Sequence, residues 1–211
     1  MVDIATAVRE ASTVRKVRAD DATRAAVALG EAFESDPVAC WLIPDDVLRR
    51  DLLERAFLLF LRRIWLAQDA CYMTDGGVGA AVWELPGQWK LGVWDQLRLL
   101  PRLALTYRGY TPRLVGTINA MESGHPKAEH HYLAFVGVVP EWQGRGIGAA
   151  LLKPVLDRAD AERMPAYLEA SSPRNRSLYE RHGFAVTEEF HVGKGSPPLW
   201  RMWREPAPGG G

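Results

Sequence analysis

The order of hydrophobic and polar residues predicts a strand followed by two helices in the first third of the chain. Residues 14–19 alternate apolar and basic side chains, as a half-buried strand does, and one of the next two aspartates can cap a helix to about Phe33. The prolines within 36–44 predict a loop. Residues 45–67 repeat leucines at helical spacing, which predicts a long amphipathic helix whose apolar face needs a sheet to cover it.

A hairpin and a helical insertion are predicted next. Two strand-like segments, 70–74 and 78–84, flank an Asp-Gly-Gly sequence that supplies the positive φ angles of a tight turn. Residues 86–128 are rich in Leu, Trp and Tyr and predict two helices broken near Pro101 and Pro112. We expect this insertion to pack on the core.

The second half of the chain has the pattern of a βαβ unit. An apolar strand over 130–139 is followed by a glycine-rich loop, a helix that runs through Pro154 to about Arg163, and a strand over 165–170. The remainder predicts one short helix and two strands, over 175–182, 184–192 and 199–204. The predicted fold class is therefore α/β, with a mixed sheet of about seven strands and helices on both faces.

Composition places this pattern in one globular domain. The 211 residues are 47% hydrophobic and 25% charged, which is typical of a chain that folds around a single core. We expect the domain to span 13–205, with 86–128 as its insertion, and residues 1–12 and 206–211 to be disordered.

Charge and cysteine content exclude several function classes. The 26 Lys and Arg residues equal the 26 Asp and Glu residues, which disfavours nucleic acid and anionic membrane surfaces as partners. No apolar run reaches the roughly 20 residues of a membrane-spanning helix, and no secretory signal is evident, so we expect a cytoplasmic protein. Cys40 and Cys71 are too few for a disulfide framework or a metal cluster, so we expect buried thiols, or a pair if the fold brings them together, and no metal.

The strongest chemical signal is a glycine cluster between the buried strand and the next helix. Gly144, Gly146 and Gly148 leave main-chain N–H groups unshielded at a helix N-terminus, where a diphosphate can bind and Arg145 can add a charged contact. The alternative is a loop whose glycines only permit a sharp turn.

A second class of phosphate site fits part of the same pattern. Gly144, Gly146 and Ala149 also match the dinucleotide fingerprint G-x-G-x-x-A, and Glu169 follows at about the expected separation. Residues 140–143 intervene between strand and first glycine, however, and only 42 residues remain after Glu169 for further βαβ units. A nicotinamide-dependent reductase is therefore the second hypothesis.

Two motifs resemble those of the GNAT acetyltransferases. The sequence VGVVPEWQGRGIGAALL is similar to their acetyl-CoA site, with the signature Gln/Arg-x-x-Gly-x-Gly/Ala met by Gln143, Gly146 and Gly148. NRSLYERHGF, at 175–184, resembles their second signature. Within the superfamily, GAAVWELP, LEASSPRN and YERHGF are similar to the puromycin N-acetyltransferase group.

The resemblance implies a sheet splayed between two parallel strands, where acetyl-CoA, the co-substrate, lies against main-chain groups. Gly137 is available for a β-bulge that starts the splay. The cofactor-binding positions implied are Val136, Val138, Val139, Gln143, Gly144, Arg145, Gly146, Ile147, Gly148, Ala149 and Asn175.

The resemblance also implies catalytic roles. Tyr179 occupies the position of the acid that protonates the departing thiolate, and the Val138 amide is the natural donor to the developing oxyanion. The preferred base is Glu169 acting through a water. Each has a structural alternative: a core tyrosine, and a hydrogen-bonded carboxylate at a strand end. The segment 130–132 (His-His-Tyr) competes for the role of base.

From the resemblance we expect the acetyl acceptor to be a primary amine of a small molecule. The similarity to the puromycin group favours an aminonucleoside-like antibiotic as this molecule, and a role of the enzyme in antibiotic resistance. Trp41, Trp83 and Tyr110 are candidates for the wall of its pocket, with core packing as the alternative. Neither cysteine lies in a nucleophile motif, so we expect direct transfer of the acetyl group, without a covalent enzyme intermediate. We expect a monomer or a homodimer. A non-catalytic CoA-binding sensor is the remaining alternative.

Overall fold

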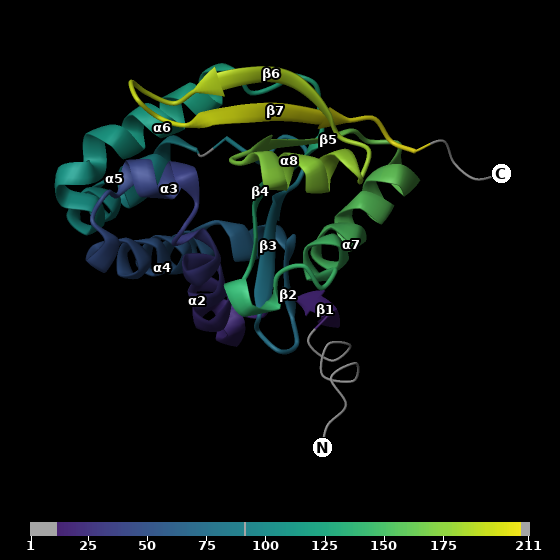
Figure 1. Cartoon of the computed structure of the whole chain (residues 1–211), viewed down its shortest axis with the longest axis horizontal. Coiled ribbons are helices and arrows are strands. Elements are labelled where there is room, and N and C mark those ends of the chain that lie inside the picture. The colour runs from purple at the N-terminus through teal and green to yellow at the C-terminus, as the bar shows by residue number, and fades with distance from the viewer. Residues whose placement is uncertain (1–11, 91, 208–211) are drawn as a thin grey trace.

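The computed structural model describes residues 12–90 and 92–207. Its seven strands form one open sheet, whose arrangement can be followed in Figure 1. Its strand order is β1-β2-β3-β4-β5-β7-β6, and β4 with β5 is the one parallel pair among the described strands. The strands are β1 (Val14–Lys16), β2 (Cys71–Thr74), β3 (Gly79–Glu84), β4 (His131–Val138), β5 (Ala166–Ala170), β6 (Ala185–His191) and β7 (Pro198–Arg204). The predicted α/β class and mixed seven-stranded sheet are confirmed.

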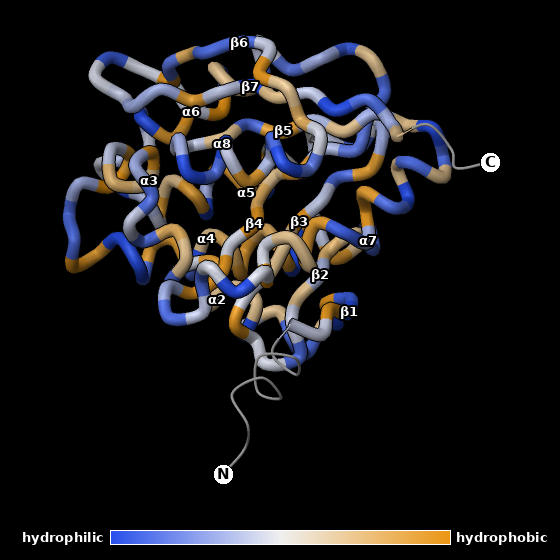
Figure 2. Tube along the Cα trace, turned by 45° about the vertical axis from the view of Figure 1, so that its right-hand side comes forward, coloured by the Kyte–Doolittle hydropathy of each residue, from blue (hydrophilic) through white to orange (hydrophobic). Residues whose placement is uncertain are grey.

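Helices cover both faces of this sheet. They are α2 (Ala22–Phe33), α3 (Pro37–Leu42), α4 (Asp46–Arg63), α5 (Val93–Tyr107), α6 (Thr111–Ser123), α7 (Ile147–Glu162) and α8 (Pro173–Glu180). Alternate residues of β3 enter two different cores: Ala80 and Val82 pack with α2 and α4, whereas Ala81 and Trp83 pack with α7. Figure 2 shows the hydrophobic segments gathered along the central strands and the inner sides of these helices.

The prediction of a loop over 36–44 is wrong, because this segment contains the short helix α3. The Asp36 carboxylate accepts hydrogen bonds from the amides of Val38 and Ala39, at 2.9 and 3.1 Å, and Pro37 occupies the first turn. An aspartate cap followed by proline is a helix-start signal. The next helix, α4, begins at a second aspartate cap as predicted but ends at Arg63, and a 3₁₀ turn over Trp65–Gln68 replaces its expected last turn.

The two helices of the predicted insertion are present, but Pro101 does not separate them. It lies inside α5, on an exposed face, and the chain turns instead in a 3₁₀ segment over Arg108–Tyr110. Pro112 lies in the first turn of α6, where a missing N–H costs nothing.

The domain limits stay a prediction. Of the two terminal segments expected to be disordered, residues 1–11 and 208–211 lie outside the described part of the chain. Among the described helices, none is both long and apolar enough to cross a membrane.

The sheet is splayed in its centre. Pairing between β4 and β5 ends at Leu133 and Leu168, although β4 continues for five more residues to Val138. The register of β3 with β4 shifts at Ala134, so the bulge predicted at Gly137 is wrong. Gly137 is required for a different reason: a Cβ there would lie 2.7 Å from the side chain of Ala32, so its absence lets α2 pack closely on β4.

Candidate functional site

A groove of about 640 Å³ lies where β4 and β5 separate. Its lining comes from β4, the loop before α7, the first turn of α7, α8, the end of α2 and the segment that follows α2. Because no strand pairs with the β5-facing edge of β4 beyond Leu133, main-chain groups along that edge are available to an extended ligand. The splay predicted from the resemblance is therefore present.

The glycine loop forms one end of the groove. Gly144 and Gly146 have φ angles of +75° and +81°, and no atom lies within 4 Å of a Cβ built at either position. The left-handed backbone, not lack of space, therefore requires glycine there. Gly146 provides no side-chain cap for α7, so the first-turn amides stay available to a bound anion.

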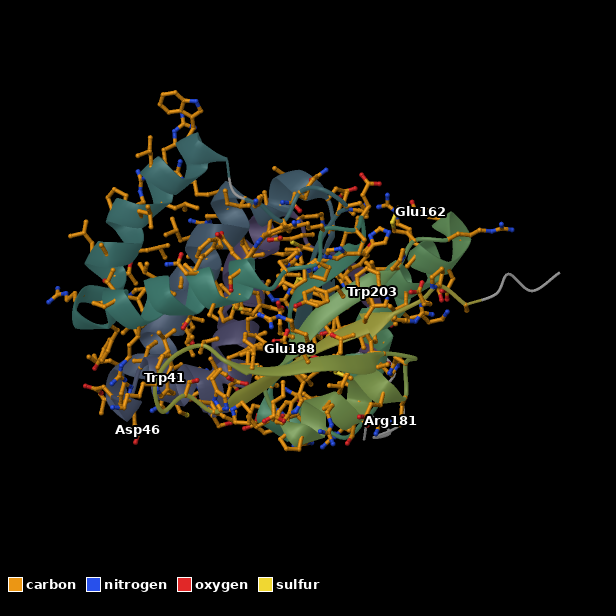
Figure 3. The ribbon with its side chains drawn as sticks, turned by 90° about the horizontal axis from the view of Figure 1, so that it is seen from above. Trp41, Asp46, Glu162, Arg181, Glu188 and Trp203 are labelled. Carbon is orange, nitrogen blue, oxygen red and sulfur yellow. The ribbon has the colours of Figure 1, made fainter. Side chains whose placement is uncertain are left out.

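Most of the predicted cofactor-binding positions line this groove: Val136, Val138, Gln143, Gly144, Gly146, Ile147, Gly148, Ala149 and Asn175. Val139 and Arg145 do not line it. The Val139 amide donates to the Val78 carbonyl at 2.9 Å, and the Arg145 guanidinium lies 4.9 Å from the centre of the Trp142 ring. Two other arginines bring positive charge to the groove, Arg174 and Arg181, of which Arg181 is labelled in Figure 3.

A second cavity of about 310 Å³ meets the groove from the other side. The two share the same five lining residues at their junction: Phe33, Asp36, Val136, Asn175 and Tyr179. A molecule in the groove and a molecule in the cavity would therefore meet beside Tyr179.

Tyr179 lies on α8 and is 6% exposed. Its ring packs edge-on against Phe184, and its hydroxyl has no hydrogen-bond partner in the described part of the chain. Burial, followed by the nearby charge of Asp36, raises the pKa of Tyr179 well above its ordinary value. The phenol is therefore protonated at neutral pH and can donate that proton to a group placed at the junction.

Asp36 is a site residue that the sequence analysis did not identify. Besides capping α3, its carboxylate accepts a short hydrogen bond from the Ser171 hydroxyl, which in turn accepts one from Asn175 Nδ2 at 3.4 Å. Burial raises the pKa of Asp36. This chain of contacts ties the start of α3 to the loop between β5 and α8. The Asp-Pro sequence was a sufficient signal for the helix cap, but not for the contact with Ser171.

Two of the carboxyl groups that line the second cavity come from the sheet. The predicted base, Glu169 on β5, accepts a hydrogen bond from the Tyr167 hydroxyl at 2.8 Å, and burial raises its pKa to about 7. Glu84 on β3 was not identified from the sequence; it is 7% exposed and accepts from Trp65 Nε1 at 2.8 Å. Burial, with the charge of Glu169 as a smaller cause, raises the pKa of Glu84 to about 7 as well.

The competing candidates for the base separate in the structure. His131 does not line the cavity; its Nε2 lies 2.9 Å from the carboxylate of Glu162, which Figure 3 labels. His130 does not line the cavity; its Nε2 lies 3.0 Å from that of His125, which does. Burial lowers the pKa of all three histidines. Tyr132 lines the cavity and hydrogen-bonds Glu169.

The aromatic residues predicted to wall the acceptor pocket line neither cavity. Trp83 is fully buried in the core beneath α7, and Tyr110 packs on the edge of the other core. Trp41, labelled in Figure 3, contacts the loop at Gly193 and the Arg113 guanidinium. The pocket wall is formed by other aromatic residues, namely Phe33, Phe57, Phe60, Trp65, Trp89, Tyr107, Tyr132 and Phe135.

A splayed mixed sheet, an uncapped glycine loop and a second cavity meeting the groove define an acyl-CoA-dependent transferase. The family model of the acetyltransferase (GNAT) family matches residues 64–184, more than half of the chain. The chain belongs to this family and is an N-acetyltransferase that uses acetyl-CoA.

Relatives span nearly the whole chain. A Schizosaccharomyces pombe protein named uncharacterized N-acetyltransferase C550.08 is 27% identical over 91% of this chain and 83% of its own length. A solved structure titled histone acetyltransferase HPA2 and related acetyltransferase, from Corynebacterium glutamicum, is 27% identical with a TM-score of 0.70, covering 93% of this chain and 97% of that one. Arylalkylamine N-acetyltransferase 2 from Aedes aegypti shares the fold, at 12% identity and a TM-score of 0.57, over 92% and 98%.

Proposed function

We propose that this enzyme transfers the acetyl group of acetyl-CoA directly to the primary amine of a small molecule. The observation that carries the proposal is the meeting of the groove and the second cavity at Tyr179. A cavity of about 310 Å³ behind the junction suits a small acceptor better than a protein chain, because ligand pockets bury most of a small molecule's surface.

The groove residues supply what a CoA ester needs. The main chain of Val136 and Val138 offers hydrogen bonds along the unpaired edge of β4, and the amides at 146–149 offer donors for a diphosphate. Gln143 holds the loop to the strand, since its Nε2 donates to the Val138 carbonyl at 3.0 Å. Asn175 lies at the junction. We leave Val139 and Arg145 out of this set because neither lines the groove.

Bound acetyl-CoA would supply a thioester as the acetyl donor. Glu169, whose pKa of about 7 leaves it largely ionised above neutrality, accepts the proton of the incoming ammonium group, directly or through a water. The Val138 N–H is the candidate donor to the negative charge that develops on the acetyl oxygen. Tyr179 donates its proton to the departing sulfur.

The rival functions lose support from the same geometry. A nicotinamide-dependent reductase needs a Rossmann-type parallel sheet, whereas the described sheet has a single parallel pair. A non-catalytic CoA sensor would not need a second cavity that opens at Tyr179. That the acceptor is an aminonucleoside-like antibiotic, and that the enzyme acts in antibiotic resistance, stays a prediction, which the amine panel below tests.

The test is CoA release measured with acetyl-CoA and a panel of amines that includes puromycin and a histone-tail peptide. Tyr179→Phe should lower kcat by about 10² or more while leaving acetyl-CoA affinity unchanged. Tyr72→Phe is the matched control, since Tyr72 lies on β2 and lines neither cavity. An unchanged rate for Tyr179→Phe would remove this residue from the mechanism, and release only with the peptide would overturn the small-molecule acceptor.

A further inference from the structure

The second cavity, which we call the acceptor cavity because the proposed function places the amine there, is lined by acidic side chains and by no cationic one in the described part of the chain. Four carboxyl groups line it, from Asp36, Glu84, Glu122 and Glu169, and none of its described lining residues is Lys or Arg. Its histidine, His125, is neutral, since burial lowers the pKa of that ring to about 3. Arg201 lies outside the lining, but its charge acts on Glu169 and His125. The four carboxyl groups outnumber it, so the lining favours a positively charged ligand over an anionic one.

Glu84 and Glu169 lie on the same face of the sheet, on either side of Tyr132. The register pairs Glu84 with Tyr132 across β3 and β4, and Tyr132 with Tyr167 across β4 and β5. Glu169 comes two residues after Tyr167 and so points to the same face. The two carboxyl groups are close enough that the charge of Glu169 raises the pKa of Glu84.

The rest of the wall is apolar and largely aromatic. Phe33, Phe57, Phe60 and Phe135 come from α2, α4 and β4 and form one side, and Trp89 stacks on the His125 ring with 3.7 Å between ring centres. Contact with such a wall favours the binding of an acceptor that carries an aromatic ring, because the apolar surface of the ring is buried, and does not favour a polar acceptor.

From this arrangement we infer that Glu84 is an acceptor-specificity residue: with Glu169 it holds the ammonium group of an amine whose body is apolar and aromatic and carries no acidic group. The inference rests on the proposed acetyltransfer function and narrows its substrate class. In the transfer step the ammonium loses one proton to Glu169, and the neutral nitrogen forms the C–N bond as the C–S bond breaks. The sulfur takes the proton of Tyr179, and the second proton of the nitrogen passes to the Tyr179 phenolate, which leaves an amide and the CoA thiol.

A purely structural role for Glu84 makes a different prediction. Its carboxylate accepts the Trp65 indole N–H, and glutamine offers an oxygen acceptor of the same shape. Glu84→Gln therefore removes the charge and keeps this contact. If Glu84 only anchored Trp65, the variant would treat every amine as the wild type does.

The experiment compares kcat/KM for phenethylamine, phenylalanine and propylamine in the wild type and in Glu84→Gln. For the wild type we expect phenethylamine to exceed phenylalanine by about 10² or more, because the added carboxylate meets like charges, and to exceed propylamine by about tenfold or more, because the ring is lost. In Glu84→Gln, kcat/KM for phenethylamine should fall about tenfold, mainly through KM, and its advantage over phenylalanine should shrink by a similar factor.

Glu129→Gln is the matched control, since it removes the same charge from an exposed position before β4. Calorimetric titration of the wild type, saturated with CoA, with phenethylamine and with phenylalanine tests the preference without any variant. Equal binding of the two amines, or an unchanged preference in Glu84→Gln, would overturn the inference. The proposed function would still hold in that case if other amines gave acetyl-CoA-dependent CoA release. No acetyl-CoA binding and no release with any amine would instead refute the proposed function itself.

Discussion

Replacing Glu84 by glutamine should stabilise the fold at alkaline pH, although it should weaken acceptor binding. Burial raises the pKa of Glu84 from 4.5 to about 7, so the folded protein binds this proton more tightly than the unfolded chain does. Below pH 4.5 the carboxyl is protonated in both states and has no effect on stability. As the pH rises toward 7 the unfolded chain ionises first, and the free energy of unfolding falls. Above pH 7 the loss reaches at most about 3 kcal/mol.

Glutamine cannot ionise, and it keeps an acceptor for the Trp65 indole. The variant should therefore equal the wild type in stability near pH 4.5 and exceed it by about 1–3 kcal/mol at pH 8.5. Urea denaturation followed by circular dichroism at the two pH values measures the difference, with Glu129→Gln as the control. A difference that stayed constant with pH, or one that reversed sign, would refute the assignment of Glu84 as a buried carboxyl with a raised pKa. The expected gain in stability with loss of binding is a stability–function trade-off.

Three further predictions concern the base, the packing under the groove and the Asp36 network. Because burial raises the pKa of Glu169 to about 7, kcat/KM for an amine that stays protonated should fall as the pH drops below 7, and Glu169→Gln should remove that step from the pH profile; an unchanged profile would exclude Glu169 as the base. Gly137→Ala places a Cβ 2.7 Å from a side chain of α2 and should lower the free energy of unfolding by about 1–3 kcal/mol, whereas Gly109→Ala, with no atom within 4 Å, should lower it far less. Ser171→Ala removes a hydrogen bond from the buried Asp36 and should cost about 1–3 kcal/mol of stability and raise KM for acetyl-CoA; a silent variant would show that this contact positions nothing.

The half of the fold that follows residue 130 was predictable because its signals are local. A buried strand, a glycine loop and a helix are consecutive there, so sequence spacing determines which main-chain groups meet. The insertion was harder to predict, since a proline inside a helix normally breaks it. At Pro101 the helix continues on an exposed face, where water can satisfy the carbonyl that loses its donor, and this exposure cannot be known from the sequence.

Glycine illustrates a second limit. Gly144 and Gly146 were expected to expose main-chain N–H groups, or only to permit a sharp turn, and both have positive φ angles. Gly137 was assigned to a bulge, but it is needed because α2 crosses β4 at that point, with Ala32 against it. A backbone requirement is visible in the local motif, whereas a packing requirement depends on an element about a hundred residues earlier.

The same distinction separates the two halves of the site. The main-chain donors of the groove come from one continuous segment, 136–149, so most of their positions followed from a motif, although Val139 and Arg145 do not line the groove. The acceptor cavity takes its side chains from α2, α4, β3, α6, β4 and β5, and no spacing in the sequence relates Glu84 to Glu169. Substitutions on those elements can change the acceptor without disturbing the glycine loop. The fold can therefore keep one acetyl donor while the acceptor varies, and for this chain the acceptor has to be deduced from the charge and the aromatic wall of the cavity.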